Sequence, residues 1–274
     1  MAPLGSGVGP PVIGCDLDGV IWRGDEPVPG AAAGIESLRA AGLRVAFLSN
    51  NSSRVVADVV AKLGRVGIVA DPDDVLTSAR AAAELLARDL APGSRVMVCA
   101  GPGVIEALTE AGFEPVEHRP AAAVVVGFHE DFDFAGLTRA ADAVRDGARF
   151  VATNADPTYP IPGGVVPGAG AIVAAVATAS GREPEVAGKP GEPTVAMVQR
   201  ELGPVGVMIG DRPSTDGALA DALGWPFALV LSGVTAAVVP PGGEAIPDPP
   251  PAYVAADLGV LAPRLVAALT SPPV

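Results

Sequence analysis

The sequence predicts an α/β protein in which helices cover a parallel β-sheet. Short apolar runs alternate with helical patterns from one end of the 274-residue chain to the other, as expected for a parallel sheet with helices on both faces. Hydrophobic residues make up 49% of the chain and aromatic residues only 4%. The core must therefore be built mainly from Ala, Val, Leu and Ile, and such side chains suit helices packed on parallel strands.

The first and last thirds of the chain share one alternation of strands and helices. Apolar runs predict buried strands at 12–16, 44–49, 206–209 and 227–231. Helical patterns predict helices at 31–41, 54–63, 192–201, 215–223 and 258–269. Gly64 directly follows the second of these helices, and glycine is a typical residue at which a helix stops.

The middle of the chain has an alternation of its own. Strands are predicted at 95–99, 122–126 and 150–153, and helices at 78–90, 104–111, 134–145 and 169–180. About a hundred residues of this content can form a second hydrophobic core. We therefore expect an α/β domain at 79–185, inserted into a discontinuous core domain formed by 1–78 and 186–274.

The charge of the chain limits its partners. The formal net charge is −13, which argues against non-specific binding of nucleic acid and against adhesion to an anionic membrane. We expect neither as a partner. An anionic small molecule would have to be attracted by a local feature, such as a metal ion, a lysine or a helix N-terminus.

The sequence also favours a cytoplasmic location. Cys15 and Cys99 are the only cysteines and lie far apart, so no disulfide framework is implied and a reducing compartment fits best. Residues 1–11 are rich in Gly and Pro and lack a basic region followed by an apolar run, so we expect a flexible leader and no signal peptide. The apolar runs are interrupted before about 18 residues, too short to span a membrane.

Asp16 and Asp18 stand where the first predicted strand gives way to Gly19. Ligands collect at the carboxyl ends of strands in open α/β sheets. Two residues apart on an extended chain, side chains project the same way, roughly 6–7 Å from each other. One carboxylate can then face an electrophile while the other serves its leaving group. The motif alone is equally compatible with an Asx turn that ends a strand.

Two more acids follow a later strand. Asp211 comes directly after the apolar run that ends at 209 and Gly210, and Asp216 lies in the first turn of the next predicted helix. Taken singly, they are a loop acid and an ordinary helix-capping acid. Acids at the ends of two buried strands, however, form an oxygen-rich site for a hard cation, and Mg²⁺ prefers a few carboxylates with water and phosphate oxygens. We therefore expect Mg²⁺ as the cofactor.

Polar groups that suit a phosphate occur at two further places. Ser49 and Asn50 follow the second predicted strand, and a hydroxyl with free backbone N–H groups at such a junction can bind phosphate oxygens. Taken alone, the motif is explained more simply by a polar N-cap ahead of the next helix. Lys189 lies between Gly188 and Pro190, just before a predicted helix. It is either a surface lysine or an ammonium group that offsets the charge of the carboxylates. A P-loop is excluded, because Pro190 stands where that motif requires Ser or Thr.

In their order along the chain, these motifs resemble those of the haloacid dehalogenase superfamily of phosphatases. They are Asp-x-Asp-Gly-Val at 16–20, Ser-Asn-Asn at 49–51, Gly-Lys-Pro at 188–190 and Gly-Asp-x-x-x-Thr-Asp at 210–216. The branch of p-nitrophenyl phosphatase-like, phosphoglycolate, pyridoxal-phosphate, glycerol-3-phosphate and NagD-type enzymes is also similar at 19–24, 28–30, 47–52, 153–158, 167–170 and 187–190. The resemblance covers nearly the whole chain. It implies a Rossmann-like core with a large α/β cap inserted between the second and third motifs.

The resemblance implies roles for the acids. Asp16 would be the nucleophile that forms an aspartyl-phosphate, and Asp18 would protonate the leaving alcohol and then activate water. Mg²⁺ would be held by the Asp16 carboxylate, the Asp18 main-chain carbonyl and Asp211, with Asp216 in support.

It also implies roles for the groups around the phosphate. Ser49 and Lys189 would bind the transferring phosphoryl group, and Asn50 would line its pocket. Ser49 stands where many members of the family carry threonine, and serine keeps the hydroxyl group. The cap stretch that contains His129 is more acidic than an anionic substrate would favour, and His129 suits a substrate contact and a cap-interface position equally.

The function that this sequence predicts is Mg²⁺-dependent hydrolysis of small phosphomonoesters. Glycerol phosphate, phosphoglycolate, pyridoxal phosphate, sugar phosphates and nucleotide monophosphates all remain open as the phosphorylated metabolite. Two alternatives are a phosphosugar mutase and a regulatory module that binds a phosphoester without turnover. Dimerisation through the cap is expected from the resemblance alone.

Overall fold

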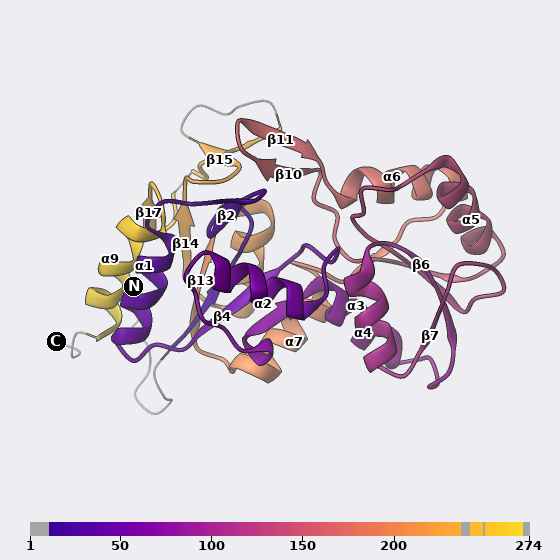
Figure 1. Ribbon diagram of the computed structural model, residues 1–274, viewed down its shortest axis with the longest axis horizontal. Helices are drawn as coiled ribbons and strands as arrows, with labels where there is room; N and C mark the ends of the chain where they lie inside the picture. The colour runs from indigo at the N-terminus through magenta and orange to yellow at the C-terminus, as the bar shows by residue number, and fades with distance from the viewer. Residues whose placement is uncertain (1–10, 237–241, 249, 271–274) are drawn as a thin grey trace.

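The computed structural model describes residues 11–236, 242–248 and 250–270 of the chain. These residues form two α/β bodies, a larger one on a six-stranded sheet and a smaller one on a five-stranded sheet (Figure 1). A hairpin of strands β10 and β11 reaches from the smaller body across the larger one. The predicted fold class, a parallel-sheet core with a second α/β unit, is confirmed.

The larger sheet is parallel throughout, in the order β17-β14-β13-β1-β4-β5. Its strands are β1 (Val12–Cys15), β4 (Val45–Ser49), β5 (Val75–Thr77), β13 (Gly206–Gly210), β14 (Phe227–Val230) and β17 (Tyr253–Ala255). Every residue of β1, β4 and β13 is buried, because helices cover both faces of the sheet. Such strands are continuous apolar runs in the sequence. Strands β5 and β17 were not predicted, because three residues are too few to show the apolar pattern of a strand.

Helices cover the two faces of this sheet in two groups. Helices α1, α2 and α9 pack on one face, and α3, α7 and α8 pack on the other. They are α1 (Ala31–Ala40), α2 (Val56–Arg65), α3 (Ser78–Ala87), α7 (Glu192–Leu202), α8 (Ala218–Leu223) and α9 (Leu258–Thr270). Side chains of β1 alternate between the groups, with Ile13 and Cys15 facing the first and Val12 the second.

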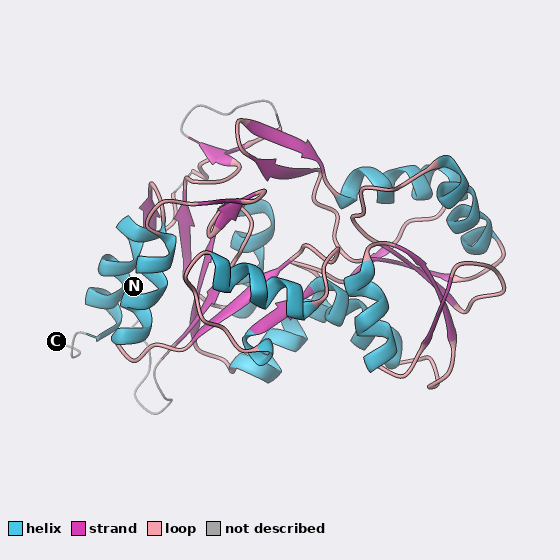
Figure 2. Cartoon of the chain, in the orientation of Figure 1, coloured by secondary structure: helices cyan, strands magenta, loops and turns pink. Residues whose placement is uncertain are grey.

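The smaller sheet is also parallel, in the order β12-β9-β8-β6-β7. Helices lie on both sides of its strands (Figure 2). Its strands are β6 (Arg95–Cys99), β7 (Glu114–Val116), β8 (Ala123–Val126), β9 (Arg149–Ala152) and β12 (Glu185–Val186). Helices α5 (Phe134–Arg145) and α6 (Ala169–Ser180) cover one face. Helix α4 (Pro102–Glu110) lies with α3 on the other.

Helix α3 joins the two bodies. It packs against α4 of the smaller body and α7 of the larger one, and one hydrophobic cluster runs from Leu76 and Met208 in the larger sheet to Val125 in the smaller. The predicted division at 78/79 and 185/186 therefore stays a prediction. The second boundary falls inside β12, a strand of the smaller sheet.

Short two-stranded pairs surround the carboxyl end of the larger sheet. They are β2 (Trp22–Arg23) with β3 (Glu26–Pro27), β10 (Thr158–Ile161) with β11 (Gly164–Pro167), and β15 (Thr235–Ala236) with β16 (Glu244–Ala245). Strand β10 is fixed to the larger body on both sides. Gly24 N–H donates to Pro160 O at 3.1 Å, and Thr158 Oγ1 donates to Gly242 O at 3.1 Å.

Two predicted helix boundaries were wrong. Helix α2 includes Gly64 and ends at Arg65, and the positive φ of 86° is at Gly67. The N–H of Ile68 then donates to Leu63 O at 2.9 Å and closes the helix, as glycine in a left-handed conformation allows. The helix predicted at 215–223 is divided into a π-helical turn, Pro213–Gly217, and α8.

Within the described residues, no helix is long and apolar enough to cross a membrane. Residues 1–10 of the expected leader lie outside the described part of the chain.

Substitution of two helical glycines by alanine is expected to have opposite effects. At Gly34 in α1 a Cβ would lie 2.9 Å from Leu258 O of α9, so Gly34→Ala should lower the free energy of unfolding by about 1–3 kcal/mol through overpacking. Gly64 in α2 has no atom within 4 Å of its added Cβ. Gly64→Ala should therefore raise stability by about 0.5–1 kcal/mol, the difference in helix propensity.

Urea unfolding of both variants beside the wild type measures these changes. Equal stabilisation by both substitutions would contradict the close approach of α1 and α9.

Candidate active site

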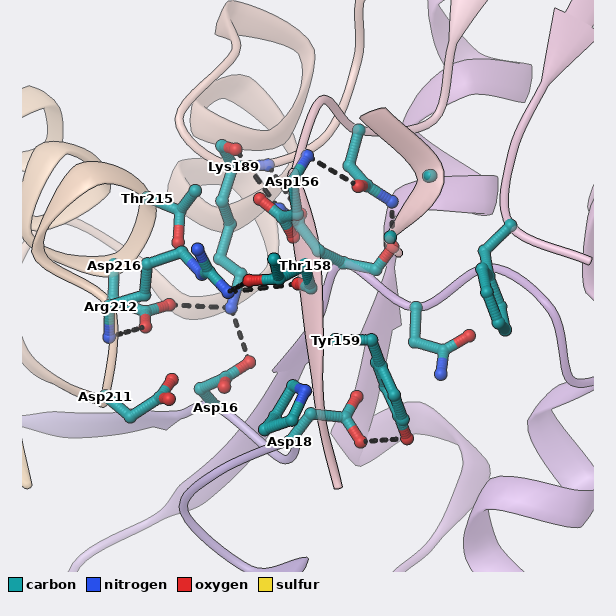
Figure 3. Close-up of a pocket in the computed structure, with 17 residues that line it drawn as sticks. Asp16, Asp18, Asp156, Thr158, Tyr159, Lys189, Asp211, Arg212, Thr215 and Asp216 are labelled. Atoms are coloured by element: carbon teal, nitrogen blue, oxygen red, sulfur yellow. Dashed lines mark hydrogen bonds and ion pairs between the residues drawn. The ribbon is translucent and has the colours of Figure 1, made fainter. Parts of the chain in front are cut away.

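Three neighbouring strand ends bring the predicted polar residues together. Strands β13, β1 and β4 are adjacent in the larger sheet, and Asp211, Asp16 and Ser49 stand at or just after their carboxyl ends. Parallel neighbours end at the same edge of a sheet, which is where ligands bind in such folds. Asp16, Asp211, Asp216 and Lys189 point toward one another at this edge (Figure 3).

Lys189 is the cation at the centre of the cluster. Its side chain is only 3% exposed, and its Nζ donates to Asp16 Oδ1 at 2.6 Å, Asp216 Oδ1 at 2.7 Å and Leu48 O at 2.9 Å. These three acceptors use all three protons of an ammonium group. The sequence left open a surface lysine, and the structure excludes it.

The loop after β14 fixes Asp211, and the turn after β13 fixes Asp216. Asp211 Oδ2 accepts from Val234 N–H at 2.6 Å, and Asp216 Oδ2 accepts from Arg212 N–H at 3.1 Å. Glycine is required beside both, because a Cβ at Gly233 would lie 1.8 Å from Asp211 Oδ2 and one at Gly210 would lie 2.3 Å from Asp216. The π-helical turn at 213–217 thus directs Asp216 back to the strand end.

The three carboxylates fit a divalent cation. One oxygen each from Asp16, Asp211 and Asp216 lies within 4.8 Å of the others, and all three residues are buried. Carboxylate oxygen is the donor that Mg²⁺ takes in proteins. Both oxygens of Asp216 already accept hydrogen bonds, from Lys189 and Arg212, so the ligand oxygens would come from Asp16 and Asp211. The supporting role of Asp216 stays a prediction, as do the ligand roles of Asp16, Asp211 and the main-chain carbonyl of Asp18.

Asn50 and Ser49 are placed differently from each other. Asn50 lines the pocket above the carboxylates. Its Oδ1 accepts from Lys189 N–H at 2.8 Å and its Nδ2 donates to Lys189 O at 3.2 Å, so Asn50 also fixes the main chain of the lysine. Ser49 Oγ accepts from Asn51 N–H at 3.1 Å and lines a small adjoining cavity. Its phosphate-binding role stays a prediction.

Asp18 lies across the pocket from Lys189 and is held by aromatic donors. Trp22 Nε1–H donates to Asp18 Oδ1 at 2.6 Å, and the Tyr159 hydroxyl donates to the same oxygen at 2.7 Å. Tyr159 comes from strand β10 and stacks on Phe128, with 5.8 Å between ring centroids. The pocket that these residues enclose measures about 50 Å³, room for a few water molecules.

Burial dominates the electrostatics of the cluster. Burial raises the pKa of Asp16 well above its usual value; Lys189 opposes the rise, while Asp216 and Asp211 add to it. Burial and the Asp216 charge raise the pKa of Asp211 to about 7. Burial lowers the pKa of Lys189, but attraction and hydrogen bonds from Asp16 and Asp216 outweigh it, so the lysine pKa is raised. Three buried carboxyl groups share one ammonium group, and a divalent cation would favour their ionised forms.

The sequence did not point to three further residues of the pocket. Asp156 accepts from Asn50 Nδ2 at 3.0 Å, Arg212 Nη2 donates to Thr158 O at 3.0 Å, and Tyr159 reaches Asp18. A signal was available for the hairpin. Pro162-Gly163 separates two short runs, and such a pair between strands is typical of a tight turn.

His129 lies away from the carboxylates. It lines a separate cleft of about 660 Å³ on the smaller body, packs edge-on against Phe132 with centroids 5.6 Å apart, and its Nδ1 is 3.1 Å from Gly127 O. Phe128, which lines both the cleft and the catalytic pocket, stands between them.

Comparison with known proteins agrees with this geometry. The family model for haloacid dehalogenase-like hydrolases matches residues 13–114, and a second model of haloacid dehalogenase-like hydrolases matches residues 186–261. An acid sugar phosphatase of Staphylococcus saprophyticus is 37% identical over 205 residues, which cover 73% of this chain and 78% of that protein. The chain belongs to the haloacid dehalogenase-like hydrolases. The predicted family is thereby confirmed.

The relatives of this haloacid dehalogenase-like hydrolase include named phosphatases. D-glycerol 3-phosphate phosphatase of Mycobacterium tuberculosis is 41% identical over 226 residues, covering 81% of this chain but only 63% of that relative. The glycerol phosphate phosphatase of M. tuberculosis in complex with magnesium superposes with a TM-score of 0.79 at 36% identity, covering 92% and 76% of the two chains. The p-nitrophenyl phosphatase of Archaeoglobus fulgidus gives 0.80 at 31% identity, covering 95% and 99%. These relatives are named for the hydrolysis of phosphoric monoesters, which is the class of activity that the sequence predicts.

Removal of the central cation is expected to destabilise the fold. Lys189→Met would leave Asp16 and Asp216 buried without their ammonium partner, and breaking a buried ion pair costs about 3–5 kcal/mol. Urea unfolding with EDTA present would measure the loss. The control is Arg88→Met, which removes an ion pair to Glu192 whose side chains are 44% and 67% exposed and should cost less than about 1 kcal/mol. Equal losses in the two variants would contradict a structural role for Lys189.

Proposed function

We propose that this protein is a Mg²⁺-dependent phosphatase that hydrolyses small phosphomonoesters through an aspartyl-phosphate on Asp16. The observation that carries the proposal is the Lys189 ammonium, which bridges Asp16 and Asp216 beside Asp211. Asp18 faces the same pocket from the other side. A nucleophile, a cation and a proton donor around one pocket are the parts that phosphoryl transfer needs.

In the proposed reaction, a carboxylate oxygen of Asp16 forms a bond to phosphorus as the bond to the ester oxygen breaks. Asp18 gives its proton to the leaving oxygen, and Lys189 offsets charge on the phosphoryl oxygens. Asp18, now ionised, takes a proton from the water that hydrolyses the aspartyl-phosphate. Asp16, Asp211 and the main-chain carbonyl of Asp18 would hold the Mg²⁺, which when bound stabilises negative charge on the phosphoryl group.

The substrate class that we propose is a small alkyl phosphate of the glycerol, glycolate or sugar type. Glycerol phosphate and acid sugar phosphatases among the relatives support it. The pocket of about 50 Å³ is far smaller than the roughly 300–1,000 Å³ of typical ligand sites. The hairpin and Phe128 must therefore move to admit the leaving group, and a compact ester requires the least displacement.

Two alternative functions predict different outcomes of the reaction with a phosphoester. A phosphosugar mutase would yield an isomerised phosphosugar without free phosphate. A regulatory module would bind Mg²⁺ and the ester without turnover. Phosphate release from a panel of glycerol 3-phosphate, phosphoglycolate, glucose 6-phosphate, pyridoxal phosphate and AMP separates both from hydrolysis. The homodimer through the cap and the cytoplasmic location both stay predictions.

The nucleophile assignment is tested by Asp16→Asn. The wild type should release phosphate from p-nitrophenyl phosphate in the presence of Mg²⁺, and the variant should lose at least about 1,000-fold in kcat because an amide is a far weaker nucleophile. Asp221→Asn, at an exposed position in α8, is the matched control and should keep full activity. Substantial activity in Asp16→Asn would exclude this residue as the nucleophile.

The metal assignment is tested by Asp211→Asn. Replacing one of two ligating carboxylates by a neutral amide should raise the Mg²⁺ concentration for half-maximal activity at least about tenfold. Activity against p-nitrophenyl phosphate over a Mg²⁺ titration measures the change, with the exposed Asp221→Asn in α8 as control. An unchanged Mg²⁺ dependence would place the metal elsewhere.

A further inference from the structure

We propose that Trp22 and Tyr159 are positioning residues that hold the general acid Asp18 by a single carboxylate oxygen, and that Lys62 fixes Trp22 in place. The inference rests on the proposed function, in which Asp18 moves the proton. It gives a role to two aromatic hydrogen-bond donors and a buried lysine, none of which takes part in the bond-making steps of the proposed reaction. None of the three contacts the Asp16, Asp211 and Asp216 cluster through a hydrogen bond in the described structure.

Both donors converge on Asp18 Oδ1. The Trp22 indole N–H lies 2.6 Å from it and the Tyr159 hydroxyl 2.7 Å. An indole N–H can only donate. A phenolic hydroxyl carries one proton, which Tyr159 donates to this oxygen. With Oδ1 occupied by two donors, the proton that Asp18 exchanges with the leaving oxygen is carried by Oδ2.

The two donors come from segments far apart in the chain. Trp22 belongs to the tight loop after β1, where Gly19 N–H donates to Trp22 O at 2.7 Å. Tyr159 belongs to strand β10 of the hairpin, whose Pro160 and Thr158 carbonyls are bonded to Gly24 and Arg212 of the larger body. The hydroxyl therefore reaches Asp18 only with the hairpin seated on the larger body (Figure 3). Asp18 is fully held once β10 lies over the pocket.

Lys62 packs against the face of the Trp22 indole ring. Its side chain is only 6% exposed, its Nζ lies 4.3 Å from the centroid of the Trp22 ring, and it donates to Gly24 O at 2.6 Å. An ammonium on the face of an indole attracts the ring, more strongly when water is excluded. The neighbouring cavity between Lys62, Trp22 and Asp18 measures about 20 Å³, room for about one water molecule. On this side of Asp18, little solvent can therefore compete with the indole N–H.

This arrangement makes a chemical prediction about the leaving group. An alkoxide must be protonated as it leaves, whereas p-nitrophenolate is stable as an anion near neutral pH. The value of kcat/KM covers binding and the transfer to Asp16, and it excludes the later hydrolysis in which Asp18 acts as base. Loss of the positioning contacts should therefore lower kcat/KM for an alkyl phosphate and leave that for p-nitrophenyl phosphate nearly unchanged.

The experiment compares Trp22→Phe and Tyr159→Phe with the wild type in saturating Mg²⁺. Each variant removes one donor and keeps the aromatic ring. The substrates are p-nitrophenyl phosphate and whichever of glycerol 3-phosphate, phosphoglycolate and glucose 6-phosphate the wild type hydrolyses fastest. Each variant should lose about tenfold or more in kcat/KM for the alkyl phosphate, the size expected for a hydrogen bond to a charged group. The loss for p-nitrophenyl phosphate should stay below about threefold.

The chain offers matched controls, since it contains two tryptophans and two tyrosines. Trp225 donates its buried N–H to Pro204 O at 3.1 Å, away from the pocket, and Tyr253 lies in β17 at the edge of the larger sheet. Trp225→Phe and Tyr253→Phe should leave the ratio of the two kcat/KM values unchanged. Thermal unfolding of all four variants shows which of them keep the fold.

Lys62→Met tests the third residue. It should produce the same selective loss for the alkyl phosphate, and adding it to Trp22→Phe should cause no further selective loss, because Lys62 acts through the indole N–H. Additive losses in the double variant would contradict that route.

Equal losses for both esters, or no loss for either, in Tyr159→Phe and Trp22→Phe would overturn the proposal. Failure of the proposed function gives a different result, since the wild type itself would then release phosphate from neither ester.

Discussion

The arrangement of this protein depends on one buried ion cluster. Lys189 reaches the carboxyl ends of β1 and β4 and the turn after β13 with a single ammonium group, which contacts Asp16, Leu48 and Asp216. Buried charges are costly unless they are paired and hydrogen-bonded. The three segments can therefore be buried together only with the lysine between them. Because Lys189 follows the smaller body in sequence, the same contact also fixes where the chain re-enters the larger one.

Several features of the backbone follow from this cluster. Gly210 and Gly233 leave no room for a side chain beside Asp216 and Asp211. The π-helical turn at 213–217 replaces the first turn of an ordinary helix and returns Asp216 to the strand end. Asn50 binds the main chain of Lys189 through both its amide oxygen and its amide nitrogen. These close glycine contacts and the π-helical turn place the charged side chains at the strand ends. Irregular backbone of this kind is concentrated at functional sites in proteins.

In the proposed function, the chemistry and the choice of substrate belong to different parts of the molecule. The groups proposed for phosphoryl transfer lie at the carboxyl end of the larger sheet, whereas Asp156, Tyr159 and Phe128 come from the segment 95–186, which contains the smaller sheet and the hairpin. The hairpin β10–β11 links the two parts, because its Tyr159 contacts Asp18 directly. In the proposed function, a substrate seated under β10 would thus meet an acid that is already oriented, as efficient proton transfer requires.

The sequence by itself determined the alternation of the longer strands and helices along the chain, the family, and the acids at the ends of β1 and β13, because buried parallel strands and strand-end motifs are local patterns. It also indicated Lys189, although not that the lysine is buried. Only the tertiary structure decided which groups meet: Asp18 with Trp22 and Tyr159, Lys62 with Trp22, and Asn50 with Lys189. Residues 18 and 159 are 141 positions apart. No local pattern encodes such a contact, since it is set by how two separately formed sheets and their hairpin pack together.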